Sequence, residues 1–286
     1  MNIQWFPGHM NKTRRLLSEN LKLVDVVIEL IDSRIPISSK NPEIDNIIKD
    51  KKRVIAMNKS DLADDVISKM WEKWYAAQGI TCVLIDSLSG KGIKQLQNKM
   101  KEAIKEKLEK DRKRGRIFRP IRTMVVGIPN VGKSSFINKI AGKRSAATGD
   151  RPGVTRGPQW VRLNREIQLL DTPGILWPKF EDSRVGLNLA FTGAIKDDII
   201  DIVSIASSLM ETLALLYPQN IIRHYKLTSV EGIRGEELLH IAGKNRGCIA
   251  AGGEVDYNRI AAIVLDEFRG GKIGRITLEK PMKTEN

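Results

Sequence analysis

The feature that most constrains this chain is an eight-residue loop, Gly127-Ile128-Pro129-Asn130-Val131-Gly132-Lys133-Ser134. It matches G-x-x-x-x-G-K-[ST], a phosphate-binding pattern that requires a strand before it and a helix after it. Both flanks comply, because residues 121–126 are an apolar run and apolar residues recur at helical spacing from Phe136 to Ile140. A glycine-bearing turn that matches by chance is the alternative, and the two flanks argue against it.

The residue types of this loop suit a bound phosphate. Glycines let successive backbone N–H groups turn towards the anion, and the start of the helix adds the positive end of its dipole. Lys133 is expected to reach the β- and γ-phosphates, as both a binding and a catalytic residue, and the Ser134 hydroxyl to ligate Mg²⁺. The predicted binding set around them is Asn130, Val131, Gly132 and Ser135.

Apolar runs and helical patterns alternate along the first 179 residues. Such alternation implies an α/β domain with a mostly parallel sheet and helices on both faces. Ligands of these sheets bind beyond the carboxyl ends of the strands, where every polar motif of this chain stands. The expected strands are residues 23–31, 53–57, 81–85, 121–126, 159–163 and 167–170.

From about Phe180 the pattern changes to long apolar helical stretches. Asp256 fits the N-cap of a helix that ends at Phe268, before a pair of glycines. We therefore expect two domains, an α/β domain over residues 1–179 and a smaller, mostly helical domain over residues 180–286. The other expected helices of the second domain are residues 184–195, 199–216 and 234–242.

A second polar motif, Asn58-Lys59-Ser60-Asp61, directly follows an expected strand. The Asp61 carboxylate only accepts hydrogen bonds, so it matches the N1–H and N2–H₂ donors of guanine, a donor pair that adenine lacks. Lys59 is expected to lay its stem along the base, and Ser87-Leu88 stands where a loop that supports the base is expected. An ordinary polar turn is the alternative for residues 58–61.

A third motif, Asp171-Thr172-Pro173-Gly174, follows the last expected strand. D-x-x-G at this place is typical of a sensor for Mg²⁺ and the γ-phosphate. Asp171 is expected to hold the metal through water, and the Gly174 N–H to approach the phosphate, because glycine has no side chain. Thr155 is the favoured second hydroxyl on Mg²⁺, with Thr148 as the alternative.

The net charge of +14 is distributed unevenly. Residues 101–165 contain 18 Lys and Arg against 5 Asp and Glu, whereas residues 166–222 contain 3 against 8. A local basic surplus favours a polyanionic partner, with nucleic acid ahead of acidic protein or membrane. Charge that serves solubility alone would be spread more evenly.

Composition narrows the class further. A hydrophobic content of 41% and a charged content of 29% are those of a soluble globular protein. Cys82 and Cys248 stand far apart in apolar surroundings, as expected of core thiols in a reducing cytoplasm. We find neither a signal peptide nor an apolar stretch of about 18 residues, and we expect a cytoplasmic monomer without a membrane partner.

These motifs are the signatures of a GTPase in a rotated order, since the base-reading loops precede the phosphate-reading ones. The chain resembles the YlqF/RbgA family of circularly permuted ribosome-assembly GTPases along essentially its whole length. Further segments support this resemblance, and with the three motifs above the set is Trp5–Met10, Asp32–Pro36, Asn58–Asp61, Gly127–Ser134, Asp171–Gly174 and Gly271–Thr277.

The resemblance implies a circularly permuted P-loop GTPase domain followed by a helical domain that contacts ribosomal RNA. It also implies Mg²⁺-dependent hydrolysis of GTP to GDP and a role in late assembly of the large ribosomal subunit. A nucleotide-gated RNA-binding protein, in which hydrolysis is incidental, is the alternative. A membrane-associated signalling GTPase is disfavoured because no anchor is evident.

One expected catalytic residue is missing. Many Ras-like GTPases place a glutamine after D-x-x-G to orient the attacking water, and here that position is Ile175. We therefore expect slow intrinsic hydrolysis that a partner accelerates. His9 is a candidate for positioning the water, or a structural histidine beside a turn. Asn130 resembles the asparagine of GTPases that bind K⁺ beside the phosphates, or it is a turn-forming residue.

Overall fold

The computed structural model describes residues 10–48, 51–115, 120–142, 159–162, 166–171 and 182–282. The chain divides into two compact units. The first comprises residues 1–180 together with 279–286, and the second comprises residues 181–278. The sequence pattern assigns all of 180–286 to the second domain, whereas the structure returns the chain to the first unit at Glu279.

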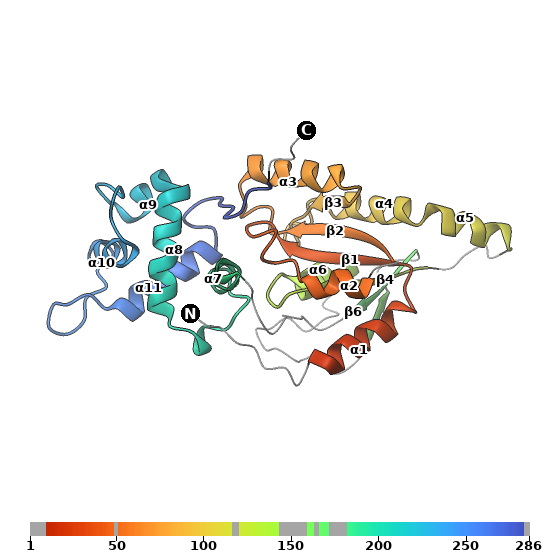
Figure 1. The fold of residues 1–286 in the computed structure, drawn as a ribbon, viewed down its shortest axis with the longest axis horizontal. Helices are drawn as coiled ribbons and strands as arrows, with labels where there is room; N and C mark the ends of the chain where they lie inside the picture. The colour runs from red at the N-terminus through yellow and green to blue at the C-terminus, as the bar shows by residue number, and fades with distance from the viewer. Residues whose placement is uncertain are drawn as a thin grey trace. The chain divides into compact units, whose positions relative to one another are not determined.

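The first unit is built on a six-stranded sheet (Figure 1). Five strands run parallel to their neighbours, and one edge strand, β5, is antiparallel to β6. The predicted mostly parallel α/β fold is therefore confirmed. In sheet order the strands are β3 (Thr81–Leu84), β2 (Lys52–Asn58), β1 (Val26–Asp32), β4 (Ile121–Gly127), β6 (Ile167–Asp171) and β5 (Gln159–Arg162).

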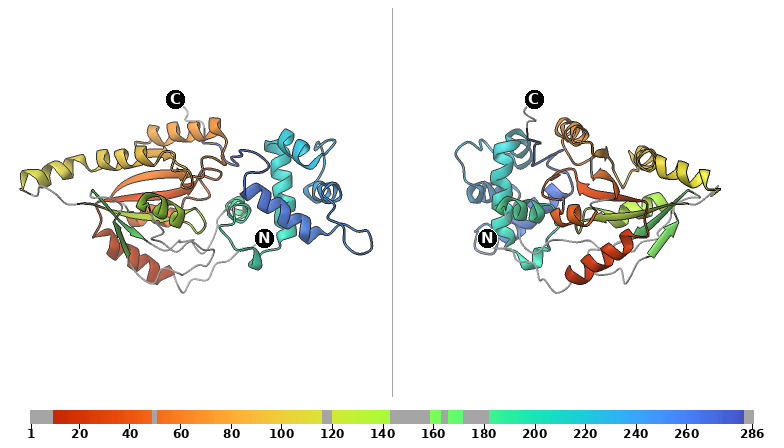
Figure 2. Two further views of the ribbon diagram at one scale, coloured as in Figure 1. Left: turned by 180° about the vertical axis from the view of Figure 1, so that it is seen from behind. Right: turned by 45° about the vertical axis from the view of Figure 1, so that its right-hand side comes forward.

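Helices cover both faces of this sheet (Figures 1 and 2). On one face α1 and α2 pack over β1, β4 and β6 through a buried apolar cluster that includes Leu17, Ile44, Met124 and Leu170. On the other face α4 packs on β2 and α6 on β4, whereas α3 packs on β3 on the same face as α2, where its Tyr75 lies near Glu29 and Arg53. The helices are α1 (Met10–Leu21), α2 (Pro42–Ile48), α3 (Asp65–Ala77), α4 (Ile93–Ala103), α5 (Lys105–Lys113) and α6 (Lys133–Ala141).

The second unit is helical around α8 (Ile202–Leu216), which contacts each of the other four α-helices of the unit. Gly235 lets α10 approach α8 closely, because a Cβ there would lie 2.0 Å from the Ser207 carbonyl oxygen. Asp256 caps the last helix by accepting from the Arg259 N–H, as predicted. The remaining helices are α7 (Ser183–Phe191), a 3₁₀ turn (Asp197–Ile199), α9 (Pro218–Tyr225), α10 (Gly235–Asn245) and α11 (Tyr257–Arg269).

The tail that follows the second unit is held in the first unit by Glu279. Its carboxylate accepts from the backbone N–H groups of Ile37 (2.6 Å) and Ser38 (3.1 Å) and from the Ser38 hydroxyl. Its carbonyl accepts from the buried indole N–H of Trp71 at 2.9 Å. Among the described helices, none is long and apolar enough to cross a membrane.

Candidate functional site

The carboxyl ends of β1, β2 and β4 bring the sequence motifs to one edge of the sheet. In the parallel register Asp32 stands beside Asn58, and Leu30 stands beside Gly127. The Ser33 N–H then donates to the Asn58 carbonyl at 2.9 Å, which extends the pairing one residue past the strand end. The three loops that leave this edge therefore start side by side.

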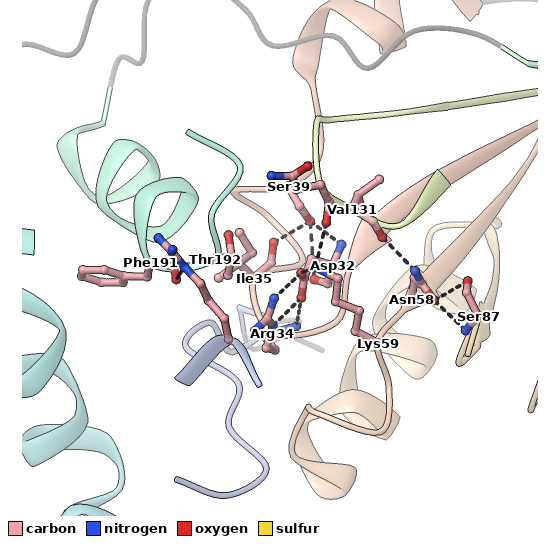
Figure 3. A network of polar contacts seen from close by, with 12 residues as sticks. Asp32, Arg34, Ile35, Ser39, Asn58, Lys59, Ser87, Val131, Phe191 and Thr192 are labelled. Atoms are coloured by element: carbon pink, nitrogen blue, oxygen red, sulfur yellow. Dashed lines mark hydrogen bonds and ion pairs between the residues drawn. The ribbon is translucent and has the colours of Figure 1, made fainter. Parts of the chain in front are cut away.

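Asn58 joins two of the predicted loops through its side chain (Figure 3). Its Nδ2 donates to the Val131 carbonyl in the phosphate loop at 2.8 Å. Its Oδ1 accepts from the backbone N–H of Ser87 at 3.1 Å and from the Ser87 hydroxyl at 2.7 Å. Asn58 and Ser87 are both buried, so this amide fixes segments that lie far apart in the sequence.

Lys59 makes the second link to the phosphate loop. Its Nζ donates to the Asn130 carbonyl at 2.8 Å and pairs with Asp32 Oδ2 at 3.0 Å. Burial lowers the pKa of the Lys59 ammonium, while the neighbouring Asp32 carboxylate opposes that effect. The backbone of Lys59 is left-handed, at φ 58°, a conformation that lysine adopts only when its surroundings impose it.

The phosphate loop curves around Lys133. The Lys133 Nζ donates to the carbonyls of Gly127 (3.1 Å) and Ile128 (2.8 Å), so the ammonium lies inside the loop. Asn130 is exposed, and its backbone is left-handed, at φ 56°. Gly132, at φ 99°, begins α6 as its N-cap, and a Cβ there would lie 2.3 Å from Asn58 Nδ2. Only glycine therefore fits between the two loops.

The other predicted base-reading residues lie on the surface of this site. Asp61 is exposed, and the Leu88 side chain is 76% exposed. The loop that presents Leu88 is shaped by Asp86, whose carboxylate accepts from the N–H groups of Leu88 (2.7 Å) and Ser89 (3.1 Å). Burial alone raises the pKa of Asp86, but these hydrogen bonds outweigh it and the net pKa is lowered.

The metal-binding candidates are described only in part. Ser134 and Ser135 are half-buried in the first turn of α6, and Asp171 is the last residue of β6. A serine hydroxyl and a carboxylate are the hard oxygen donors that Mg²⁺ prefers, so this donor set fits the metal. Other predicted residues lie outside the described parts of the chain, namely His9, Thr148, Thr155, Gly174 and Ile175.

Sequence patterns alone assign no role to Asp32 and Arg34, which the structure places at the site. Arg34 grips the Asp32 carboxylate with its Nε on Oδ1 (2.9 Å) and a terminal nitrogen on Oδ2 (2.8 Å), and both side chains are buried (Figure 3). Burial alone raises the pKa of Asp32, but Arg34 and Lys59 outweigh it and hold the pKa well below its usual range. The position of Asp32 at the end of a predicted strand was the sequence signal that could have indicated its place at the site.

Comparison with known proteins gives concordant results. The model of a family described as 50S ribosome-binding GTPase matches residues 122–226. The match begins at β4 and leaves the upstream loops at 58–61 and 87–90 outside, as the rotated motif order predicts. The fold is similar to the solved structure of GNP-bound YlqF from Thermotoga maritima, with a TM-score of 0.66 and 26% sequence identity. The match covers 95% of this chain and 99% of that one.

Curated relatives are similar to this chain along nearly their full length. Ribosome biogenesis GTPase A of Bacillus cereus is 49% identical over 282 residues, which span 98% of this chain and 95% of that protein. The protein of the same name from Priestia megaterium is 49% identical over 287 residues, 100% of this chain and 99% of that protein. On this evidence the chain is a GTPase and belongs to the ribosome biogenesis GTPase A family, also called YlqF/RbgA.

Proposed function

We propose that this chain binds GTP where the three loops meet and hydrolyses it during late assembly of the large ribosomal subunit. The observation that carries the site is the Asn58 amide, which joins Val131 of the phosphate loop to Ser87 of the base loop. A guanine held by one loop and a triphosphate held by the other require that these loops keep a fixed separation.

We assign the base to the upstream loops. Asp61 accepts the two guanine donors, Lys59 supports the base, and the exposed Leu88 offers an apolar surface for its face. The phosphates lie against the backbone of residues 130–135, with Lys133 turned from its loop carbonyls to the β- and γ-phosphates. Ser134, Asp171 and Thr155 hold Mg²⁺, which when bound neutralises charge that develops on the phosphates.

Hydrolysis then depends on how the chain places water. Gly174 offers a backbone N–H to the γ-phosphate, and Lys133 stabilises the negative charge of the transition state. Ile175 has no group that can orient water by hydrogen bonding, so His9 is the candidate for this task. Asn130 would hold a K⁺ ion, which would supply the positive charge that an arginine finger supplies in other GTPases. Turnover is consequently slow until a partner orders the site.

The ribosomal particle is the partner that the chemistry favours. The basic surplus within residues 101–165 suits a polyanion, and part of it lies on α5, where Lys105, Lys107, Lys110, Arg112 and Lys113 occur. The family description and the names of the relatives point to the same partner. The basic surplus assigns contacts with ribosomal RNA to the first unit, and the family resemblance adds contacts by the helical unit. We propose the cytoplasm as the place of action, with the chain as a monomer.

The decisive experiment measures GTP turnover with and without large ribosomal subunits, together with co-sedimentation in GDP, GTP analogue and no nucleotide. We expect turnover to rise with added subunits and co-sedimentation to be strongest with the GTP analogue. Absence from the subunit in all three conditions refutes the assembly role. Co-sedimentation without stimulated turnover instead supports a nucleotide-gated RNA-binding protein.

A further inference from the structure

Lys59 must be fixed in one conformation to serve the nucleotide site. It must stay against the Asn130 carbonyl while its long stem supports the base, and a lysine loses more rotamer entropy than most side chains when it is fixed. Its left-handed backbone adds a conformational cost. A separate group that holds the ammonium before nucleotide binds therefore lowers the cost of binding.

Asp32 has the geometry to be that group. Its Oδ2 is shared between Lys59 Nζ (3.0 Å) and Arg34 (2.8 Å), while its Oδ1 accepts from the backbone N–H (3.0 Å) and Nε (2.9 Å) of Arg34. The Asp32 N–H donates to the Ser39 hydroxyl at 2.9 Å, which in turn donates to the Ile35 carbonyl at 2.7 Å. The carboxylate is thus held rigidly on a closed turn.

We infer that Asp32, held in place by Arg34, is a positioning residue for guanine nucleotide binding, which it serves by fixing the Lys59 ammonium against the Asn130 carbonyl. The inference rests on the proposed function, because it assigns Lys59 to the nucleotide site. Asp32 is not a catalytic residue, since it reaches the nucleotide only through Lys59.

The surrounding charges support this role. Arg34 is 1% exposed and needs a counter-ion, and Asp32 supplies it. If that were the whole role of Asp32, Arg34 would be its only cationic partner. Lys59 is an additional cation on the same carboxylate, and without Asp32 it loses the anion that sustains its charge. The Arg34 fork fixes the orientation of the carboxylate, so that Oδ2 remains directed at Lys59.

A double-mutant cycle on the full-length chain tests this role, with the Kd for fluorescent GDP as the readout. Asp32→Asn removes the charge at constant size, and Lys59→Met removes the ammonium. We expect Asp32→Asn to weaken GDP binding about tenfold when Lys59 is present. In the Lys59→Met background the same change should alter Kd less than about twofold, because the two residues act as one unit.

Two further variants keep the test decisive. Glu29→Gln changes another buried carboxylate of β1 that is paired with an arginine, and it should leave the Kd unchanged. Arg34→Lys keeps the charge but loses the paired hydrogen bonds to the two Asp32 oxygens. It replaces Asp32→Asn in the cycle if the Asp32 variant does not fold. An equal loss in both Lys59 backgrounds overturns the inference and leaves the proposed function standing. A wild-type chain that binds no GDP refutes both.

Discussion

Gly132 lies where the phosphate loop meets Asn58, and two constraints there exclude any larger residue. Its φ of 99° disfavours any residue with a Cβ, and that Cβ would also lie 2.3 Å from Asn58 Nδ2. We predict that Gly132→Ala weakens GDP binding at least about tenfold, because Asn58 must move and release Val131 or Ser87. Titration with fluorescent GDP measures this effect.

Gly142 at the other end of α6 supplies the matched control. It is also left-handed, at φ 66°, but no atom of the described residues lies within 4 Å of the position of its Cβ. Gly142→Ala should therefore lower stability by about 1 kcal/mol and leave GDP affinity unchanged. If both variants lose the same affinity, the contact with Asn58 is irrelevant to binding.

Asn130 and His9 are two candidates to replace the catalytic contribution of the missing glutamine, and each predicts a different outcome. If K⁺ beside Asn130 supplies the positive charge, kcat falls when Na⁺ replaces K⁺ at equal ionic strength. If His9 positions the water, His9→Ala lowers the ribosome-stimulated kcat. Equal rates in the two salts exclude the K⁺ route, and an unchanged kcat of the His9 variant excludes the other.

The neighbouring strands β1 and β2 carry a buried carboxylate that should make stability depend on pH. Glu29 of β1 is 1% exposed and pairs with Arg53 of β2, which also contacts Asp45 of α2. Burial raises the pKa of Glu29 from 4.5 to about 7, although Arg53 acts in the opposite direction. Between these two values the folded chain binds more protons than the unfolded chain, so the free energy of unfolding falls as pH rises.

We predict that this fall amounts to about 3 kcal/mol between pH 4.5 and pH 7 and is lost in Glu29→Gln. Urea denaturation of the two proteins across this range measures it. Glu109→Gln, which removes an exposed carboxylate on α5, is the control. Parallel pH profiles of wild type and Glu29→Gln would show that Glu29 is already ionised throughout.

The elements themselves could largely be predicted, because the strands are mostly apolar runs and the helices show apolar residues at helical spacing. β1 and β2 differ from their predicted bounds by a few residues. The helices α4 and α5 meet at Ile104, whose backbone leaves the helical conformation at φ −114° and whose side chain is buried. The helix α9 was missed because Pro218 opens it directly after α8.

The contacts of the site were less accessible than its motifs. The patterns indicate that residues 58–61, 87–88 and 127–134 serve one nucleotide, because all follow parallel strands. They do not indicate that Asp32 pairs with Lys59, since that ion pair depends on the register of β1 and β2 and on the turn that follows. Likewise, the return of Glu279 to the first unit depends on tertiary contacts with Ser38 and Trp71.

At the scale of the whole molecule, the tail makes the first unit depend on the end of the chain. Glu279 satisfies the N–H groups of Ile37 and Ser38, in the turn that follows Asp32 and Arg34. We predict that deletion of residues 279–286 speeds amide exchange in residues 33–41 at least about tenfold, because each lost hydrogen bond contributes about 1 kcal/mol or more. Deletion of residues 283–286 alone is the control, and equal exchange in both truncated chains contradicts the prediction.

In the proposed function, the rotated order of the motifs means that the base is read by residues synthesised before the phosphate loop. The account therefore depends on Asp61 acting on the same nucleotide as Lys133. Asp61→Asn tests this most directly, because an asparagine amide can donate to the C2 carbonyl of xanthine, where guanine presents a donor. The measurement compares the affinities for GDP and for xanthosine diphosphate in wild type and variant. The account predicts that wild type prefers GDP and that Asp61→Asn prefers xanthosine diphosphate. An unchanged preference for GDP in the variant would contradict it.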